Sequence, residues 1–416
     1  MADFSLQDPI EEESLENSAD TSSEQWWTSF VLAGIIVFSL FDLSLRLFYR
    51  PNIFESPYRS WIVSAITDSP MGLPKPKIVI FGSSLVVATV NDGDAATLGE
   101  EIDGTTHHRS ITLERALAPD AKNPASAPLT QSYAIGGQMA SDAYAIFHTL
   151  YNGMDPIVRN RFLPPEVIVW GIAPRDLMDA TFLDPHSSTT VAYLDKLKYD
   201  HDSLGSRGFS FWRKMEEVGD RMIYSYDQRE HFVVLQKKVM YGLLGIMGIV
   251  PAKDMGTVKT PQELLRIARR ELPEDNGLRQ WMVKPQTGPT TQFEDNSKEY
   301  TSRYNPFKQK LFDLQVSYLE KFLAMANQHN IKVLLVNMPL TQDNLNLIPP
   351  GKYQTYLDTV QKAAAANNAV FVDFNDGKQF TREFFNDPVH LNGYGSQRFF
   401  RKVAEELKKA TEKQID

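Results

Sequence analysis

Short apolar runs rich in β-branched residues recur along this chain, and most are followed by a longer stretch with helical periodicity. The runs are residues 78–81, 166–171, 332–339 and 369–373. Runs of this length and composition are typical of strands buried inside a sheet. Because strands that alternate with helices usually pair in parallel, the pattern predicts an α/β fold, a three-layer sandwich around a mainly parallel sheet.

The stretch 305–329 shows the helical pattern most clearly, with its large apolar residues on one side of the predicted helix. These residues are Phe307, Leu311, Leu314, Tyr318, Phe322 and Met325. Helices are also predicted over 353–367 and 395–413.

The segments between the runs are less regular. Residues 132–142 predict a strand, a glycine-rich turn and a helix that begins at Ser141 or Asp142 and continues toward Tyr151. Residues 92–131 are rich in turn residues and are predicted to be irregular. From about 185 to 300 the strand pattern is lost, which predicts a helical insertion into the sheet domain.

The N-terminal part differs in composition from the rest. Residues 1–25 are acidic without a basic residue, which predicts a disordered tail. Residues 26–49 are apolar and, at about 1.5 Å per residue, could span a hydrocarbon core of roughly 30 Å as a transmembrane helix. Prolines mark 50–76 as a linker, so the sheet domain is expected over 77–413. A core helix of a soluble domain is the alternative for 26–49.

The orientation of this predicted single-pass membrane protein is ambiguous from charge alone. Arg46, Arg50 and Arg59 follow the apolar segment, whereas the tail before it is acidic. The positive-inside rule would therefore place the large domain in the cytoplasm.

Charge and composition exclude several classes of function. The 416-residue chain has a net charge of −9 and no basic stripe, which disfavours nucleic-acid binding. The absence of cysteine excludes disulfides, thiolate metal sites and cysteine nucleophiles. The histidines, His107 and His108 among them, recur at no metal-binding spacing, so no metal and no cofactor is predicted.

Two motifs far apart in the sequence carry the chemistry. Ser84 follows the first apolar run, at the strand end where α/β sheets bind ligands, and Asp387-Pro388-Val389-His390 lies before the final predicted helix. A serine attacks an acyl carbon when a base takes its proton. His390 is the predicted base and Asp387 the group that orients it. Ser83 is the rival nucleophile.

Gly82-Ser83-Ser84-Leu85 resembles the Gly-Asp-Ser-Leu block of the SGNH (GDSL) hydrolase superfamily, and Asp387 to His390 resembles its closing Asp-x-x-His block. The layout is similar to membrane-anchored bacterial SGNH-like polysaccharide O-acetyltransferases and to uncharacterised cyanobacterial relatives. The resemblance covers roughly 75–185 and 310–405. It implies a flavodoxin-like sheet and places the catalytic domain outside the cytoplasm, which we expect here against the charge rule.

The resemblance also implies donors for the oxyanion. These are the backbone N–H of Ser84 and a glycine of the second block, here Gly136 or Gly137, with Ala134 as the alternative in another register. The third block departs from the family pattern, because Gly171-Ile172-Ala173 stands where Gly-x-Asn is expected. Arg175 or Asn392 could replace the missing donor, although Arg175 could instead pair with Asp176 or Asp179.

From these features we expect serine-dependent transfer or hydrolysis of an O-acyl ester, with acetyl groups on a cell-envelope polysaccharide as the substrate. The resemblance suggests a multi-pass membrane acyltransferase as a partner. Two alternatives remain open. One is a non-catalytic scaffold with the same fold, which the missing third-block Asn favours. The other is a lipid esterase working at the membrane surface, which an apolar groove under the insertion would favour.

Overall fold

The computed structural model describes residues 13–48, 66, 75–118, 127–152, 162–182, 184–185, 188–194, 197, 223, 225, 282–289 and 293–412, with backbone alone for 13–27, 189, 192 and 411–412. The chain divides into two compact units, residues 1–52 with 207–272 and residues 53–206 with 273–416. Most of the predicted linker at 50–76 and most of the insertion at 185–300 lie outside the described residues.

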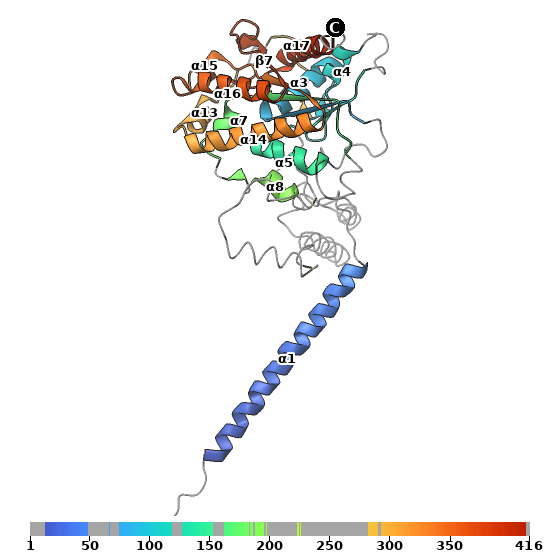
Figure 1. Cartoon of the computed structure of the whole chain (residues 1–416), viewed down its shortest axis with the longest axis vertical. Coiled ribbons are helices and arrows are strands. Elements are labelled where there is room, and N and C mark those ends of the chain that lie inside the picture. The colour runs from blue at the N-terminus through green and yellow to red at the C-terminus, as the bar shows by residue number, and fades with distance from the viewer. Residues whose placement is uncertain are drawn as a thin grey trace, which may run out of the picture. The chain divides into compact units, whose positions relative to one another are not determined.

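A five-stranded sheet forms the centre of the second unit (Figure 1). Its strands, in spatial order, are β3 Thr130–Ser132, β1 Ile78–Gly82, β4 Val167–Ile172, β6 Lys332–Asn337 and β7 Val370–Asp373. All neighbouring strands pair in parallel. The predicted fold class, α/β with a mainly parallel sheet and flanking helices, is therefore confirmed.

The two faces of β1 pack against different helices because successive side chains of a strand point to opposite sides. Phe81 contacts the rings of Phe147 and Phe322 at centroid distances of 6.3 and 5.2 Å. Ile78, an odd number of residues away, lies near Leu407 on the opposite side. The central strands are thus buried on both faces, as their uninterrupted apolar sequences predict.

Helices pack in two groups with the sheet between them (Figure 1). One group contains α3 Ser84–Leu98, α4 Ile111–Leu117 and α17 Gly393–Glu412, and the other contains α5 Ala140–Tyr151, α14 Gln309–Gln328 and α16 Lys352–Ala366. Shorter elements are α7 Arg175–Met178, α8 Thr189–Leu194, α13 Ser297–Tyr304, α15 Gln342–Leu345, the 3₁₀ turn η5 Arg382–Phe384, and an antiparallel pair of β2 Ile102–Asp103 with β5 Met282–Val283.

The prediction that 92–131 is irregular is wrong in part, because α3 continues to Leu98 and α4 follows. Tertiary contacts override the turn signal. A Cβ on Gly93 would lie 3.1 Å from the Cβ of Ser396 in α17, so the glycine allows the two helices to approach. The buried carboxylate of Asp94 accepts hydrogen bonds from the N–H groups of Ile111 and Thr112 at the start of α4.

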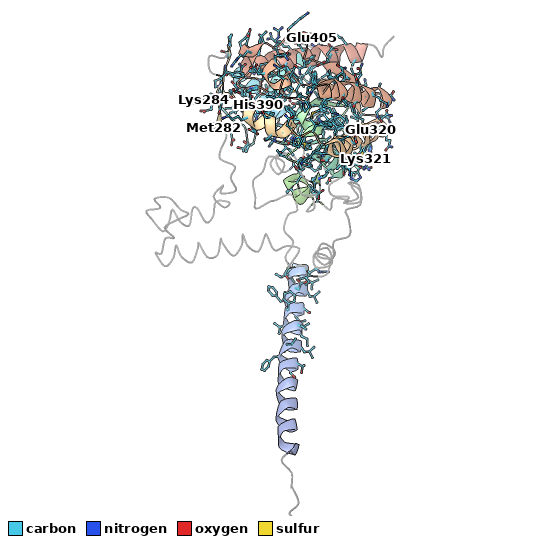
Figure 2. The ribbon with its side chains drawn as sticks, turned by 90° about the vertical axis from the view of Figure 1, so that its left-hand side faces the viewer. Met282, Lys284, Glu320, Lys321, His390 and Glu405 are labelled. Carbon is cyan, nitrogen blue, oxygen red and sulfur yellow. The ribbon has the colours of Figure 1, made fainter. Side chains whose placement is uncertain are left out.

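The apolar N-terminal segment is a helix, α1 Glu13–Phe48. It begins within the tail that was predicted to be disordered, because glutamates are good helix formers and stabilise a helix N-terminus. Thr28–Phe48 is long and apolar enough to cross a membrane. Its large side chains project outward, and those of Phe30, Val37 and Leu47 are more than half exposed (Figure 2).

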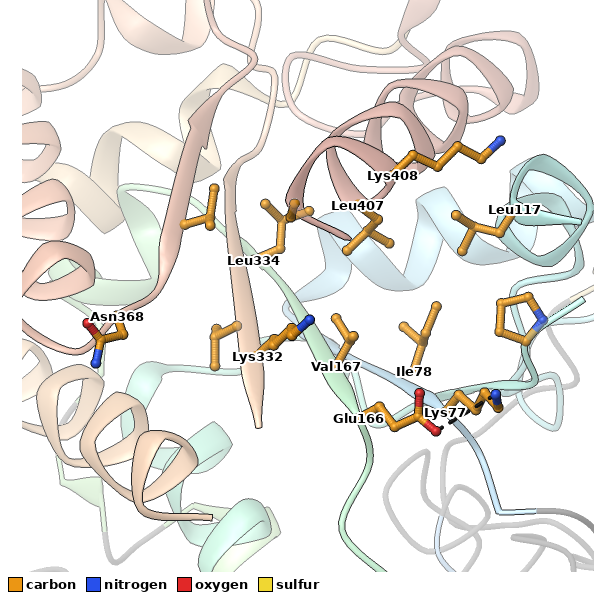
Figure 3. A pocket seen from close by; sticks show the side chains of 14 residues that line it. Lys77, Ile78, Leu117, Glu166, Val167, Lys332, Leu334, Asn368, Leu407 and Lys408 are labelled. Carbon is orange, nitrogen blue, oxygen red and sulfur yellow. Dashed lines mark ion pairs between the residues drawn. The ribbon is translucent and has the colours of Figure 1, made fainter. Parts of the chain in front are cut away.

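A groove of about 530 Å³ lies at the amino ends of the central strands (Figure 3). Ile78, Val167 and Leu334 form its floor together with Leu407, and Lys408 lies at its edge. The one carboxylate in its lining, that of Glu166, is 3.8 Å from Lys77 Nζ. Its lining contains neither a serine nor a histidine, and the groove is separate from the site described below.

Candidate active site

The turn between β1 and α3 holds Ser84 at the carboxyl end of the sheet. Gly82 has φ +150°, and a Cβ there would lie 2.3 Å from Val86 Cγ2 and 2.7 Å from the carbonyl oxygen of Gly171. Only glycine fits such a conformation and such a close approach. The chain turns at Ser83 directly into α3, and Ser84 is the first residue of the helix.

The structure brings Ser84, His390 and Asp387 together although 306 positions separate the serine from the histidine. Ser84 Oγ lies 3.0 Å from His390 Nε2, and His390 Nδ1 lies 2.6 Å from Asp387 Oδ2. Asp387 accepts a hydrogen bond from the Nδ1–H group of His390, which leaves the lone pair of Nε2 facing the serine hydroxyl. The three side chains therefore have the geometry of a nucleophile, its base and the group that orients the base.

The Asp387 carboxylate is held by four donors. Oδ1 accepts the backbone N–H groups of Val389 and His390, both at 2.8 Å. Oδ2 accepts His390 Nδ1 and also Asn296 Nδ2, the latter at 3.0 Å. Burial alone would raise the pKa of Asp387, but the His390 ring and the two backbone donors outweigh burial and lower it. Asp387 is thus kept ionised and fixed in place.

Ser83, the rival nucleophile, does not face the histidine. Its side chain is 1% exposed, so its hydroxyl group is closed off from solvent. It is close enough to Asp176 to lower that carboxyl's pKa, which burial nevertheless raises to about 6. The hydroxyl that a substrate could reach is that of Ser84.

The glycine-rich loop after β3 lies against the Ser84 turn. Ile135 N–H donates to the Gly82 carbonyl at 3.0 Å, and Gly82 N–H donates to Gln138 Oε1 at 2.8 Å. From residue 133 to 139, the hydrogen bonds of the described chain account for every backbone N–H except those of Gly136 and Gly137. Ala134 N–H already donates to Ser132 Oγ. The two glycines and the first helical N–H, that of Ser84, are the donors left for an oxyanion.

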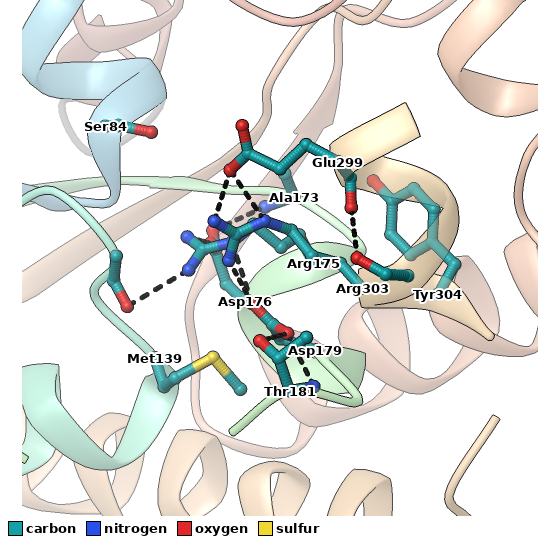
Figure 4. A network of polar contacts seen from close by, with 12 residues as sticks. Ser84, Met139, Ala173, Arg175, Asp176, Asp179, Thr181, Glu299, Arg303 and Tyr304 are labelled. Atoms are coloured by element: carbon teal, nitrogen blue, oxygen red, sulfur yellow. Dashed lines mark hydrogen bonds and ion pairs between the residues drawn. The ribbon is translucent and has the colours of Figure 1, made fainter. Parts of the chain in front are cut away.

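Arg175 is buried in an ion-pair network beside this loop (Figure 4). Its Nε lies 3.2 Å from Asp179 Oδ2, and its Nη1 lies 3.6 Å from Asp176 Oδ1. Its Nη2 donates to the Gly137 carbonyl at 3.3 Å. Asp179 is also paired with Arg303 at 2.7 Å. Arg175 therefore holds the glycine loop. It also forms the ion pairs with Asp176 and Asp179 that the sequence suggested.

Asn392, the other candidate donor, is engaged elsewhere. Its side chain is completely buried, its Nδ2 donates to the Glu383 carbonyl at 2.7 Å, and its Oδ1 accepts Gly395 N–H at 2.9 Å. Asn392 thus caps α17, and the expectation that it could donate to an oxyanion is corrected. Ala173 at the third block has no polar side chain, and its N–H donates to Asp176.

Two polar residues near the serine were not found from sequence. Asn296 lies just before α13 and contacts Asp387. Asp92 lies on α3 and, with Ser84 and His390, lines a pocket of about 660 Å³. The spacing of Asp92 from Ser84 by eight residues, two helical turns, is the one sequence signal that could have suggested their common face. Within the described residues, no group of three or more acidic or histidine side chains could hold a metal ion.

Comparison with known proteins gives little functional information. A family described as protein of unknown function (DUF1574) matches residues 259–405, less than half of the chain. No curated protein matches.

Among solved structures, a candidate acylhydrolase from Bacteroides fragilis is similar at 12% identity and a TM-score of 0.31, over 82% of this chain and 92% of that one. A carbohydrate esterase family 2 enzyme with a carbohydrate-binding domain from Corynascus thermopiles is similar at 12% identity and a TM-score of 0.32, over 82% of this chain and 69% of that one. An acetyl xylan esterase from Butyrivibrio proteoclasticus is similar at 10% identity and 0.31, over 82% and 65%.

Proposed function

We propose that this protein is a serine-dependent acyl-ester hydrolase or acyltransferase. The observation that carries the proposal is the continuous hydrogen-bonded series from Ser84 Oγ through His390 to Asp387, with distances of 3.0 and 2.6 Å. A serine, an imidazole and a carboxylate in this order supply a nucleophile, a general base and the residue that orients the base.

In the proposed reaction, Ser84 Oγ bonds to the ester carbonyl carbon while His390 Nε2 takes the hydroxyl proton. The carbonyl oxygen becomes an oxyanion, which the N–H groups of Ser84, Gly136 and Gly137 stabilise. His390 then gives its proton to the departing alcohol oxygen, and the carbon–oxygen bond of the ester breaks. Water or a second alcohol, activated by the same histidine, removes the acyl group from Ser84 and restores the enzyme.

For the finer assignment we propose an O-acetyl ester of a cell-envelope polysaccharide, with Thr28–Phe48 as a single-pass membrane anchor and the catalytic domain outside the cytoplasm. The length and apolar character of this helix support the anchor. In a transferase, a multi-pass membrane partner would supply the acyl group. The reaction is a hydrolysis when water removes the acyl group from Ser84, and a transfer when a second alcohol does so.

A non-catalytic scaffold is the second candidate function. The observation that favours it is Ala173, which offers no side-chain donor to the oxyanion and whose N–H is taken by Asp176. Removal of one oxyanion donor costs about 10²–10³-fold in rate in a serine enzyme. A scaffold would keep the fold and the buried Arg175 network but would not react at Ser84.

Covalent labelling with a fluorophosphonate tests the proposal. The reagent should modify Ser84 at neutral pH, because His390 removes the hydroxyl proton as the serine attacks, an effect typically worth about 10²–10⁴-fold. We expect His390→Ala to abolish most of the labelling and Asp387→Asn to reduce it less. Labelling should fall in acid, where a protonated imidazole has no lone pair to offer. Mass spectrometry of the modified peptide identifies the residue.

Ser83→Ala is the matched control, since it removes a neighbouring hydroxyl that does not face His390, and its labelling should match the wild type. If the folded wild-type protein remains unlabelled from mildly acidic to mildly basic pH, the proposal of an enzyme fails and the scaffold function takes its place. Labelling that survives Ser84→Ala but not Ser83→Ala would assign the nucleophile to Ser83.

A further inference from the structure

The pocket beside Ser84 lies on the histidine side of the serine. His390, Asp387 and Asn386 line it, whereas no residue of the glycine loop at 133–139 does. In ester cleavage the carbonyl oxygen points to the oxyanion donors, and the leaving oxygen must reach the histidine that protonates it. The pocket is therefore placed to receive the alcohol part of the ester.

Asp92 brings a carboxyl group into this pocket. Ser84, Ala88 and Asp92 follow one another at four-residue spacing on α3 and all three line the pocket. Residues at this spacing share one face of a helix, and two turns separate the Cα atoms of Ser84 and Asp92 by about 12 Å. Asp92 thus lines the pocket two helical turns along α3 from Ser84, and its carboxyl group interacts electrostatically with His390 and Asp387.

Two neighbouring side chains face this carboxyl group. Asn386 Nδ2 lies 3.5 Å from Asp92 Oδ1, and the nearby His390 ring favours the ionised form of the carboxyl. Within the described residues, no lysine or arginine forms an ion pair with Asp92. Asn386 is fixed in turn, because its N–H donates to the His390 carbonyl at 2.9 Å and its carbonyl accepts Glu294 N–H at 2.9 Å. Burial raises the pKa of Asp92 to about 7, so near neutral pH the group can either accept or donate a hydrogen bond.

Apart from Lys284, the rest of the lining is apolar. Val87, Ala88, Met282 and Val283 form the walls between the serine and Asp92, and Lys284 lies at the edge of the pocket near His390 (Figure 2). A sugar ring fits this arrangement because its C–H faces suit apolar walls while its hydroxyl groups can pair with a carboxyl and an amide. A hydrocarbon alcohol would displace water from this half-buried carboxyl group without offering it a hydrogen bond in exchange, which is costly.

We propose that Asp92 and Asn386 form a subsite for a hydroxyl group of a sugar-like alcohol and thereby select the alcohol part of the ester. This inference rests on the proposed function, since it assumes that Ser84 cleaves or forms the ester. It adds that recognition lies on the alcohol side, at residues outside the two motifs that carry the chemistry.

The test compares two acetate esters with the full-length protein in detergent micelles. One is 4-nitrophenyl acetate, and the other is a methyl glycoside bearing one acetyl group. We expect Asp92→Leu to lower the ratio of kcat/KM for the acetylated glycoside to kcat/KM for the aryl ester about tenfold or more, because the sugar hydroxyl loses its partner. Asp92→Asn, which keeps a hydrogen-bonding group, should lower the ratio only a few-fold.

Asp358→Asn is the matched control, since Asp358 lies on the surface of α16 and accepts a hydrogen bond from Gln354. It should leave the ratio unchanged. An unchanged ratio in Asp92→Leu would overturn the subsite. So would a wild-type preference for a long-alkyl acetate over the acetylated glycoside, which would make the pocket a hydrocarbon site.

Binding of an unacetylated methyl glycoside separates failure of the subsite from failure of the proposed function. In a folded Ser84→Ala protein, calorimetry should detect this glycoside, and Asp92→Leu should weaken its binding about tenfold. A wild-type protein that binds the glycoside through Asp92 but cleaves neither ester would refute the enzyme and keep the subsite. If the protein cleaves the esters but Asp92→Leu changes neither glycoside binding nor the ratio of the two kcat/KM values, the enzyme proposal stands and the subsite is refuted.

Discussion

Asn296 Nδ2 donates a hydrogen bond to Asp387 Oδ2 at 3.0 Å. The same carboxylate oxygen accepts the hydrogen bond from His390 Nδ1. A carboxylate only accepts hydrogen bonds, so the amide nitrogen of Asn296 must face it. The contact restrains Asp387 from a segment of the chain that lies outside both motifs. Asn296 is therefore a positioning residue in the proposed mechanism.

Replacing Asn296 with alanine should lower kcat for an aryl acetate about 3–10-fold and leave KM nearly unchanged, because one hydrogen bond to the orienting carboxylate is lost. Steady-state kinetics separate the two parameters. Asn327→Ala, which removes an exposed asparagine of α14, is the control and should change neither. A loss confined to KM would move Asn296 from positioning to substrate binding.

The half-buried Asp92 should also make stability depend on pH. Burial raises its pKa from 3.8 to about 7 in the folded protein, so between these values the folded state binds a proton that the unfolded state has released. Stability from this group is complete below about pH 4 and is lost as pH rises through 7, by at most about 4 kcal/mol. Asp92→Asn, which cannot ionise, should gain stability relative to wild type over this range. Urea unfolding at pH 5 and pH 8 measures the difference, and an equal difference at both would contradict the burial of the charge.

At the scale of elements, β1 and β4 approach α3 closely because glycines replace side chains. A Cβ on Gly171 of β4 would lie 2.4 Å from Val86 Cγ2 and 2.7 Å from Met338 Sδ. The helix that begins with Ser84 thus packs directly on the strand ends. Gly82 fulfils the same role in β1.

Gly171→Ala should destabilise the domain by about 1–3 kcal/mol through overpacking, as measured by urea unfolding. Val86→Ala removes the methyl group that the new Cβ would strike, so the double variant should be more stable than the sum of the single effects predicts. Gly99→Ala, where no atom lies within 4 Å of an added Cβ, is the control and should show no such coupling with Val86→Ala. Strict additivity for Gly171 and Val86 would contradict the described packing.

Sequence patterns predicted the elements whose signal is local. β6 was predicted with the correct first residue, and β4 and β7 to within a residue at each end, because uninterrupted apolar runs have few other uses in a soluble domain. The second half of α3 was missed because Asp92-Gly93-Asp94 has the composition of a turn. The stabilising partners of that segment lie in α4 and α17, which no local pattern shows.

The candidate site divides in the same way. Ser84, Asp387 and His390 were recognised because their spacing within each motif is local, and the fold then brings the motifs together. Asn296 and Asp92 belong to no motif and acquire their positions only through tertiary packing. Asn392 lies beside a motif and was therefore considered as an oxyanion donor, but its side chain caps the N-terminus of α17.

At the scale of the whole molecule, Thr28–Phe48 should insert into a bilayer rather than adhere to its surface. We expect the protein to stay in the membrane fraction after washing with carbonate at high pH, whereas detergent should release it. Replacement of Ile35 and Ile36 by lysine should release the protein into the carbonate wash, since each lysine at the centre of a span costs about 2.5–3.5 kcal/mol. Release of the wild type by carbonate alone would refute the anchor.

The proposed orientation can be tested because the chain has no native cysteine. Cysteines introduced singly at Ala2 and Lys413 should lie on opposite sides of the membrane. In intact cells, an impermeant maleimide should label Lys413→Cys and should label Ala2→Cys only after lysis. The reverse pattern would place the domain in the cytoplasm and exclude a cell-surface glycan as its substrate.

The 306 positions between Ser84 and His390 also set an order of events during synthesis. At roughly 5–20 residues per second, the ribosome adds the histidine about 15–60 s after the serine. During that interval the serine hydroxyl has no base. Reactivity then begins only when α17 docks on α3 and carries the preceding His390 loop to the strand ends. If Ser84 is the nucleophile and Thr28–Phe48 the anchor, as proposed above, a nascent chain cannot react while its N-terminal helix enters the membrane, and translation itself delays the first turnover until the anchor is in place.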